Sequence, residues 1–266
     1  MVLFEKKEKY DIHDLLEIMR LLRSPEGCPW DRVQTHSSIR NDLLEEAYEV
    51  ADAIDCNDDV ALCEELGDLL LQVVFHSQVA LEEQAFDFDD VADGICKKLI
   101  YRHPHVFADV IAETPDEVLS NWDALKKVEK SQSTVTDTLK SVPSAFPALM
   151  RAQKVQKRAA KVGFDWDNVD GAWDKLLEES REVKQAVEKG DTDAVTEELG
   201  DLLFSAVNVS RFLKVNAEQA LNAATDKFIS RFERVEKLAL ARGIDMNTAG
   251  LEVLDSLWDE VKTQDS

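Results

Sequence analysis

Apolar residues recur every three or four positions along most of this chain, which is the spacing of an amphipathic helix. Four segments show the repeat most clearly, and their stripes are Leu43, Ala47, Val50 and Ile54; Leu62, Leu66, Leu69 and Val73; Leu176, Ser180, Val183 and Val187; and Val195, Leu199, Leu202 and Ala206. We expect each stripe to face a core. Because no credible run of alternating strand residues accompanies them, the pattern predicts an all-α protein.

Acidic residues border these stripes and repeat at a constant spacing. The first quartet consists of Glu46, Glu49, Glu65 and Asp68. The second quartet consists of Glu179, Glu182, Glu198 and Asp201. The differences 179−46, 182−49, 198−65 and 201−68 all equal 133. This identity of spacing indicates a tandem duplication of one helical-bundle domain.

The acidic quartets suggest a cation site. If the two helices of each half pack antiparallel, four carboxylates meet at a partly buried seam. Gathering like charges there is costly unless a cation neutralises them. Mg²⁺ prefers carboxylate oxygens and completes its shell with water and phosphate, whereas zinc favours the His and Cys ligands that both quartets lack. In a chain with 54 Asp and Glu, one such quartet could be a solvated face, but two at identical spacing favour Mg²⁺ sites.

The repeat also divides the chain. Each copy opens with an amphipathic helix, over 15–23 and again over 149–160. The segment 128–148 is rich in Ser and Thr and contains two prolines, as linkers often do. We therefore predict an N-terminal helical domain over 1–127, a linker over 128–148 and a C-terminal helical domain over 149–266.

The charge balance restricts the partners. A formal net charge of −23 disfavours nucleic-acid polymers and anionic membranes. A phosphate-bearing ligand should therefore be small and held by metal or by a local basic cluster. No secretory apolar segment or stretch of transmembrane length is evident, so we expect a cytoplasmic protein.

A basic pair follows each quartet. Lys227 and Arg231 stand four residues apart in the second copy, which places both cations on one helix face where they could grip a polyphosphate. Trp258 could stack on a nucleobase, because aromatic faces bind bases with little sequence preference. Apolar neighbours surround Trp258, so a core role is equally consistent with the sequence.

The two copies differ beside their acids. Lys175 stands one turn before Glu179, whereas the corresponding position in the first copy is Asp42. A triphosphate should therefore prefer the second copy, which we predict to be the principal catalytic centre. The first copy could bind metal, retain weaker activity or serve structure.

Several longer motifs resemble those of the MazG family of all-α nucleoside triphosphate pyrophosphohydrolases, and the likeness covers nearly the whole chain. They are Glu45-Glu46-x-x-Glu49 with Glu65-x-x-Asp68, Glu178-Glu179-x-x-Glu182 with Glu198-x-x-Asp201, Cys28-Pro29-Trp30-Asp31, Arg102-His103-Pro104-His105-Val106-Phe107 and Val162-Gly163-Phe164-Asp165-Trp166. The resemblance implies a two-domain, homodimeric, Mg²⁺-dependent hydrolase that cleaves nucleoside triphosphates to monophosphate and pyrophosphate. It also implies that the second quartet ligates metal, that Lys227, Arg231 and Trp258 contact substrate, and that the C-terminal domain carries most activity.

The expected mechanism is attack of a metal-activated water on the α-phosphorus, with Lys227 and Arg231 neutralising the leaving pyrophosphate. Ribonucleotides and deoxyribonucleotides are both expected substrates, and the identity of the general base stays open. Two alternatives also stay open. One is a narrower pyrophosphohydrolase acting on dCTP, dUTP or phosphoribosyl-ATP. The other is a regulatory helical protein whose acids bind metal only for stability.

Overall fold

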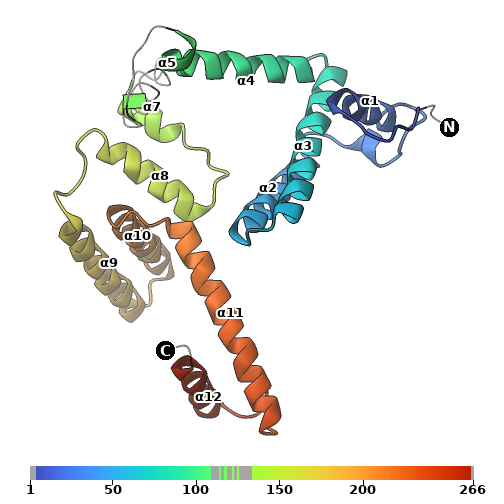
Figure 1. Cartoon of the computed structure of the whole chain (residues 1–266). Coiled ribbons are helices and arrows are strands. Elements are labelled where there is room, and N and C mark those ends of the chain that lie inside the picture. The colour runs from blue at the N-terminus through green and yellow to red at the C-terminus, as the bar shows by residue number, and fades with distance from the viewer. Residues whose placement is uncertain are drawn as a thin grey trace. The chain divides into compact units, whose positions relative to one another are not determined.

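Helices form all the regular secondary structure of the residues that the structure, a computed structural model, describes (Figure 1). These residues are 4–108 and 134–264, together with 114, 117, 118, 122 and 125. No strand occurs among them. The predicted all-α fold is therefore confirmed.

The chain divides into two compact units, Met1–Lys126 and Lys127–Ser266. The division falls beside the predicted linker, whose limits stay a prediction, and residues 128–133 of that linker lie outside the described residues. The helices of the first unit are α1 (Ile12–Leu22), the 3-10 turn η1 (Asp31–Val33), α2 (Arg40–Asp55), α3 (Asp59–Glu82), α4 (Phe88–Arg102) and α5 (Pro104–Phe107).

The core of the first unit lies where α1 packs against α3. Its buried residues are Met19, Ile39, Val74, Phe75 and Val79. The remainder of α3 pairs with α2. Because α1 anchors one end of α3, the α2–α3 pair presents its acids on a fixed support.

The second unit repeats this arrangement and extends it. Its helices are α7 (Val135–Lys140), α8 (Ala148–Ala160), α9 (Val169–Lys189), α10 (Thr192–Phe212), α11 (Ala217–Ala241) and α12 (Leu251–Thr263). Here α8 packs against α10, and α9 pairs with α10. The short helix α7 lies inside the predicted linker and packs against α8.

The turns that join the acidic helices show the duplication directly. Asn57 and Gly190, which are 133 positions apart, both adopt a left-handed backbone, with φ of 53° and 71°. Glycine adopts this conformation without a steric penalty, and asparagine tolerates it. Asp58 and Asp191 follow and cap α3 and α10 by accepting backbone N–H bonds. Each unit therefore contains an α-hairpin whose turn has the same two features, a left-handed residue followed by an aspartate that caps the next helix.

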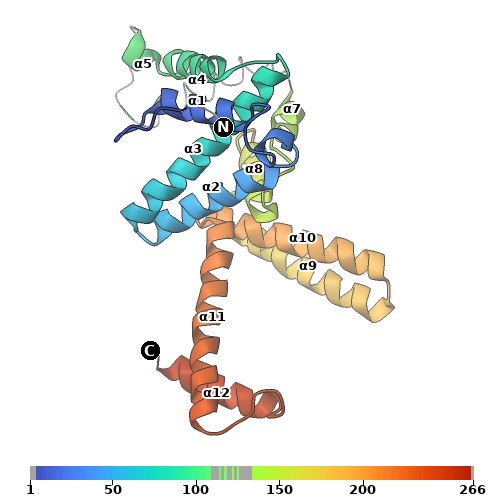
Figure 2. The same cartoon turned by 90° about the vertical axis from the view of Figure 1, so that its right-hand side faces the viewer.

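The C-terminal helices form a second hairpin. The helix α11 runs away from α8 and α10, and α12 folds back on its far end (Figures 1 and 2). Buried Val235, Ala239, Leu257 and Val261 hold the two together. In both views α12 and the far end of α11 lie apart from the α9–α10 pair, which α11 meets at its start.

The predicted core stripes are wrong in part, because the paired faces of the acidic helices are rotated from them. Ile54 and Val187, both placed in stripes, are 54% and 59% exposed. The buried positions of α2 and α9 are instead Ala53, Ala172, Ala186 and the carboxylate-bearing Glu179. Small residues allow two helices to approach closely. The contact between the paired helices therefore lies along the alanines and the acids, and not along the predicted apolar stripes.

Candidate active site

The first unit brings three acids together at the α2–α3 seam. Glu46 and Glu49 project from α2 and Glu65 from α3, and one carboxylate oxygen of each lies within 4.8 Å of the others. Asp68 is one turn beyond Glu65 and outside this group, although its charge acts on Glu46. The first quartet is thus three converging carboxylates with a fourth beside them.

The second unit repeats the cluster at the α9–α10 seam. Glu179 and Glu182 from α9 and Glu198 from α10 have carboxylate oxygens within 4.8 Å of one another. Asp201, one turn beyond Glu198, is exposed and outside the group. Three of the four predicted acids therefore meet in each unit.

Crowding and burial act on the ionisation of these acids. Burial raises the pKa of Glu46 above its usual range, and the charges of Asp68 and Glu49 raise it further. Burial likewise raises the pKa of Glu182, helped by the charges of Glu179 and Glu198. Both clusters therefore hold negative charge at a free-energy cost that a bound cation would relieve.

Glu179 is the most confined of these acids, with only 3% of its surface exposed. Its Oε1 lies 2.5 Å from Nζ of Lys175, whereas its buried Oε2 has no hydrogen-bond partner. Lys175 also reaches Glu178 at 3.1 Å, and these two hydrogen bonds raise its pKa above the usual range. An unpartnered buried carboxylate oxygen in an all-oxygen donor set fits a hard cation such as Mg²⁺.

The predicted basic and aromatic contacts lie elsewhere in the second unit. Lys227 is exposed on α11, and Arg231 is half-buried one turn further along. The ring of Trp258 on α12 contacts Phe228, with centroids 5.0 Å apart, and packs against the core of the α11–α12 hairpin. These residues lie on α11 and α12, and beyond the start of α11 this hairpin lies apart from α9 and α10 (Figure 2).

The loop that leads into α9 is held by an ion pair that sequence reasoning missed. Arg211 near the end of α10 contacts both carboxylate oxygens of Asp165, at 2.5 and 2.9 Å. Its Nε also donates to Asn208 at 2.8 Å. Arg211 and Asp165 are 46 residues apart, so no helical period links them. The only available signal was the position of Asp165 inside the motif Val162–Trp166.

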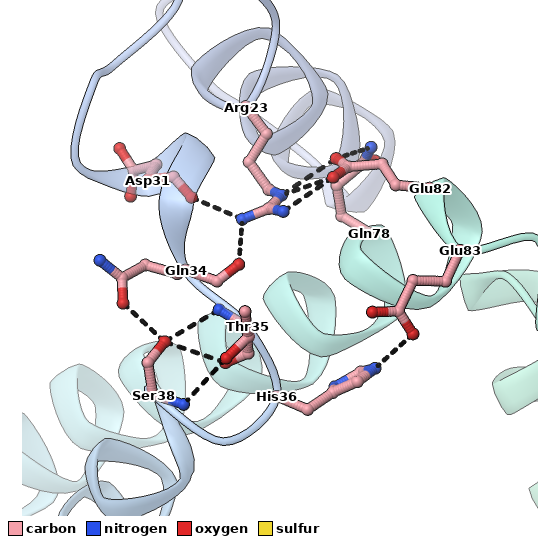
Figure 3. Close-up of polar contacts among 9 residues, drawn as sticks. All are labelled: Arg23, Asp31, Gln34, Thr35, His36, Ser38, Gln78, Glu82 and Glu83. Atoms are coloured by element: carbon pink, nitrogen blue, oxygen red, sulfur yellow. Dashed lines mark hydrogen bonds and ion pairs between the residues drawn. The ribbon is translucent and has the colours of Figure 1, made fainter.

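An arginine also holds the corresponding loop of the first unit, but it follows the first helix of the unit, whereas Arg211 lies on the second acidic helix of its unit (Figure 3). Arg23 follows α1, donates to the carbonyl oxygens of Asp31 and Gln34, and pairs with Glu82 at 2.7 Å. The side chain of Arg23 is 5% exposed. Both units therefore hold the entry to their first acidic helix with a largely buried guanidinium.

Two acid-lined helix pairs, related by one spacing and one turn geometry, define a tandem all-α protein with two similar acidic clusters. The model of the MazG nucleotide pyrophosphohydrolase domain matches this chain twice, at residues 34–107 and 171–236. The chain belongs to the MazG nucleotide pyrophosphohydrolase family. Both matched segments contain a complete quartet.

Two relatives match this chain over almost their full length, and a third matches over about half of its own length. A nucleoside triphosphate pyrophosphohydrolase of Escherichia coli K12 is 48% identical over 257 residues, covering 96% of this chain and 98% of the relative. The nucleoside triphosphate pyrophosphohydrolase/pyrophosphatase MazG of Thermotoga maritima is 44% identical over 252 residues, covering 95% and 96%. The uncharacterized protein YabN of Bacillus subtilis is 45% identical over 97% of this chain and 53% of its own length.

None of the helices in the described ranges combines the length and the apolar character needed to cross a bilayer.

Proposed function

We propose that this chain hydrolyses nucleoside triphosphates, both ribo and deoxy, to the monophosphate and pyrophosphate with Mg²⁺ in the cytoplasm. The observation that carries the proposal is the cluster of Glu179, Glu182 and Glu198, in which the buried Glu179 pairs with Lys175 and keeps one unpartnered carboxylate oxygen. The names of the E. coli and T. maritima relatives support the same reaction.

The second quartet would hold Mg²⁺ in this proposal, with Asp201 turning toward the three converged acids. When bound, Mg²⁺ lowers the pKa of a coordinated water and neutralises phosphate charge. The first quartet is proposed to hold Mg²⁺ as well. Its weaker role follows from Asp42, which places negative charge where the second unit has Lys175.

Lys175 acts on both the acids and the substrate. Its ammonium group fixes the Glu179 carboxylate and keeps a positive charge at the edge of the acidic cluster. A triphosphate approaching the acids therefore meets a cation first, which lowers the repulsion between the substrate and the site. We assign the principal activity to the second unit on this basis.

We further propose a homodimer in which a second copy supplies Lys227, Arg231 and Trp258 to the acids. Within one chain these residues lie on the α11–α12 hairpin, which beyond the start of α11 lies apart from α9 and α10 (Figures 1 and 2). Apolar side chains remain exposed on both sides, including Phe228 and Phe232 on α11 and Leu199 and Leu203 on α10. A second copy that covers these faces would place its basic pair near the substrate phosphates.

The test is turnover of ATP by three proteins in Mg²⁺ and in excess chelator. The wild type should lose activity in chelator. Glu198→Ala should lose activity on the order of 100-fold or more, because loss of a metal ligand costs at least as much as loss of a residue that hydrogen-bonds to one. Glu65→Ala is the matched control in the first unit and should keep most activity. Normal turnover in chelator, or the reverse order of the two variants, would contradict the proposal.

A further inference from the structure

The indole of Trp166 lies against the backbone of α9 at Gly171. A Cβ at position 171 would lie 2.6 Å from Cγ and 3.0 Å from Nε1 of Trp166. Both values are below the roughly 3.5–4.0 Å of ordinary contact. Gly171 has no positive φ, and glycine is unfavourable in a helix, so its backbone conformation does not explain its presence. The close indole does.

The loop that carries Trp166 is fixed on both sides of the ring. The preceding residue, Asp165, is held by both nitrogens of the Arg211 fork. Two residues further on, Asn168 caps α9 by accepting from the N–H of Asp170 at 2.8 Å. The indole therefore has a defined position, and it remains 44% exposed.

The ring lies in line with the acidic cluster along α9. Gly171, Lys175 and Glu179 are spaced four residues apart, so they occupy one side of the helix at intervals of about 6 Å. Helical side chains lean toward the N-terminus, which points Lys175 and Glu179 toward the Trp166 end. An open aromatic surface, a cation and the acids thus follow one another on the same face.

We propose that Trp166 stacks on the nucleobase of the substrate, with the triphosphate running along α9 past Lys175 to the acids. This inference rests on the proposed function and identifies a base-binding residue for it. Every nucleobase offers a π-face, so stacking tolerates purines and pyrimidines alike. We therefore expect similar KM values across the nucleoside triphosphates.

The first unit lacks this arrangement. Its loop carries Trp30, which is 58% exposed, but the position matching Gly171 is Ser38. The hydroxyl of Ser38 is bonded within its own turn, to the Thr35 carbonyl and the Gln34 side chain (Figure 3). The base platform accordingly belongs to the second unit, and Trp30 is a matched control.

The test compares Trp166→Ala, Trp166→Phe, Gly171→Ala and Trp30→Ala in steady-state hydrolysis of ATP and CTP. Trp166→Ala should raise KM for both substrates on the order of tenfold or more, with a small change in kcat. Trp166→Phe should restore most of the affinity. Gly171→Ala should raise KM by displacing the indole while favouring the helix, so this variant keeps the test informative if Trp166→Ala folds poorly. Trp30→Ala should match the wild type.

Inorganic tripolyphosphate, which has no base, separates stacking from a general structural role. Its inhibition constant against ATP should be unchanged in Trp166→Ala. An unchanged KM, or an equal loss of affinity for tripolyphosphate, would overturn the assignment of Trp166 while leaving the proposed function in place. Absence of hydrolysis by the wild type would overturn both.

Discussion

Single residues of the two acidic clusters are carboxylates held where their charge is unfavourable. Glu182 shows this most clearly, because burial and the charges of Glu179 and Glu198 raise its pKa above the ordinary 4.5. Between these two pKa values the folded state binds more protons than the unfolded state. The contribution of Glu182 to the free energy of unfolding is therefore at its maximum below the ordinary pKa. It is lost as the pH rises through the raised pKa of the folded state.

Replacing this charge should therefore stabilise the metal-free protein. We predict that Glu182→Gln raises Tm in chelator at neutral pH, with a smaller gain as the pH falls, because the raised pKa lets the wild-type group take up a proton sooner than an ordinary glutamate does. Differential scanning fluorimetry measures both. Glu188→Gln, on the exposed side of the same helix, is the control and should change little. A lower Tm for Glu182→Gln in chelator would show that the cluster is not strained by its charge.

At the scale of elements, the entry to α9 depends on the partly buried Arg211–Asp165 pair, whose side chains are 13% and 24% exposed. Arg211→Ala removes the guanidinium that donates to both carboxylate oxygens of Asp165. We expect it to lower the free energy of unfolding by about 1.5–3 kcal/mol, as loss of hydrogen bonds to a charged group does. Chemical denaturation gives this value. Arg242→Ala removes a single, exposed contact to Glu260 and should cost about 1 kcal/mol or less.

Equal losses for the two arginine variants would mean that the Asp165 contact does not hold the loop. A larger loss for Arg211→Ala, accompanied by weaker nucleotide binding, would link the loop to the site on α9.

The helices and their pairing could be predicted from sequence because local signals define them. Asn57 and Gly190 mark the turns, Asp58 and Asp191 mark the helix starts, and the acids repeat at one spacing. Which face of each helix packs against its partner could not be predicted, because the spacing of the apolar residues does not show which stripe is buried within the chain. Glu179, for example, is buried in the seam, whereas Val187 is exposed.

The loop contacts were beyond sequence reasoning for a different reason. The pairing of Arg211 with Asp165 and the contact of Trp166 with Gly171 involve irregular backbone, which has no period to detect. Sequence also could not decide the role of Trp258. In the structure this ring packs on Phe228, and its proposed substrate contact depends on a second copy.

At the scale of the whole molecule, the proposed homodimer forms each site from two copies. We predict that Glu198→Ala and Arg231→Ala are each nearly inactive alone. Co-expressed, they should recover about a quarter of wild-type turnover, because half of the dimers are mixed and each mixed dimer has one intact site. Size-exclusion chromatography with light scattering, followed by an activity assay of the mixed dimer, measures this. If the turnover of the co-expressed protein does not exceed the summed turnover of the two separate variants, the complete site lies within one chain.

The proposed reaction is defined by cleavage at the α-phosphorus of a nucleoside triphosphate. The most direct measurement incubates the purified protein with ATP and Mg²⁺ and separates the products by ion-exchange chromatography. Cleavage at the α-phosphorus releases AMP and pyrophosphate in equal amounts, and this is the expected result. ADP with inorganic phosphate would contradict it, as would the absence of any product across the ribo and deoxy nucleoside triphosphates.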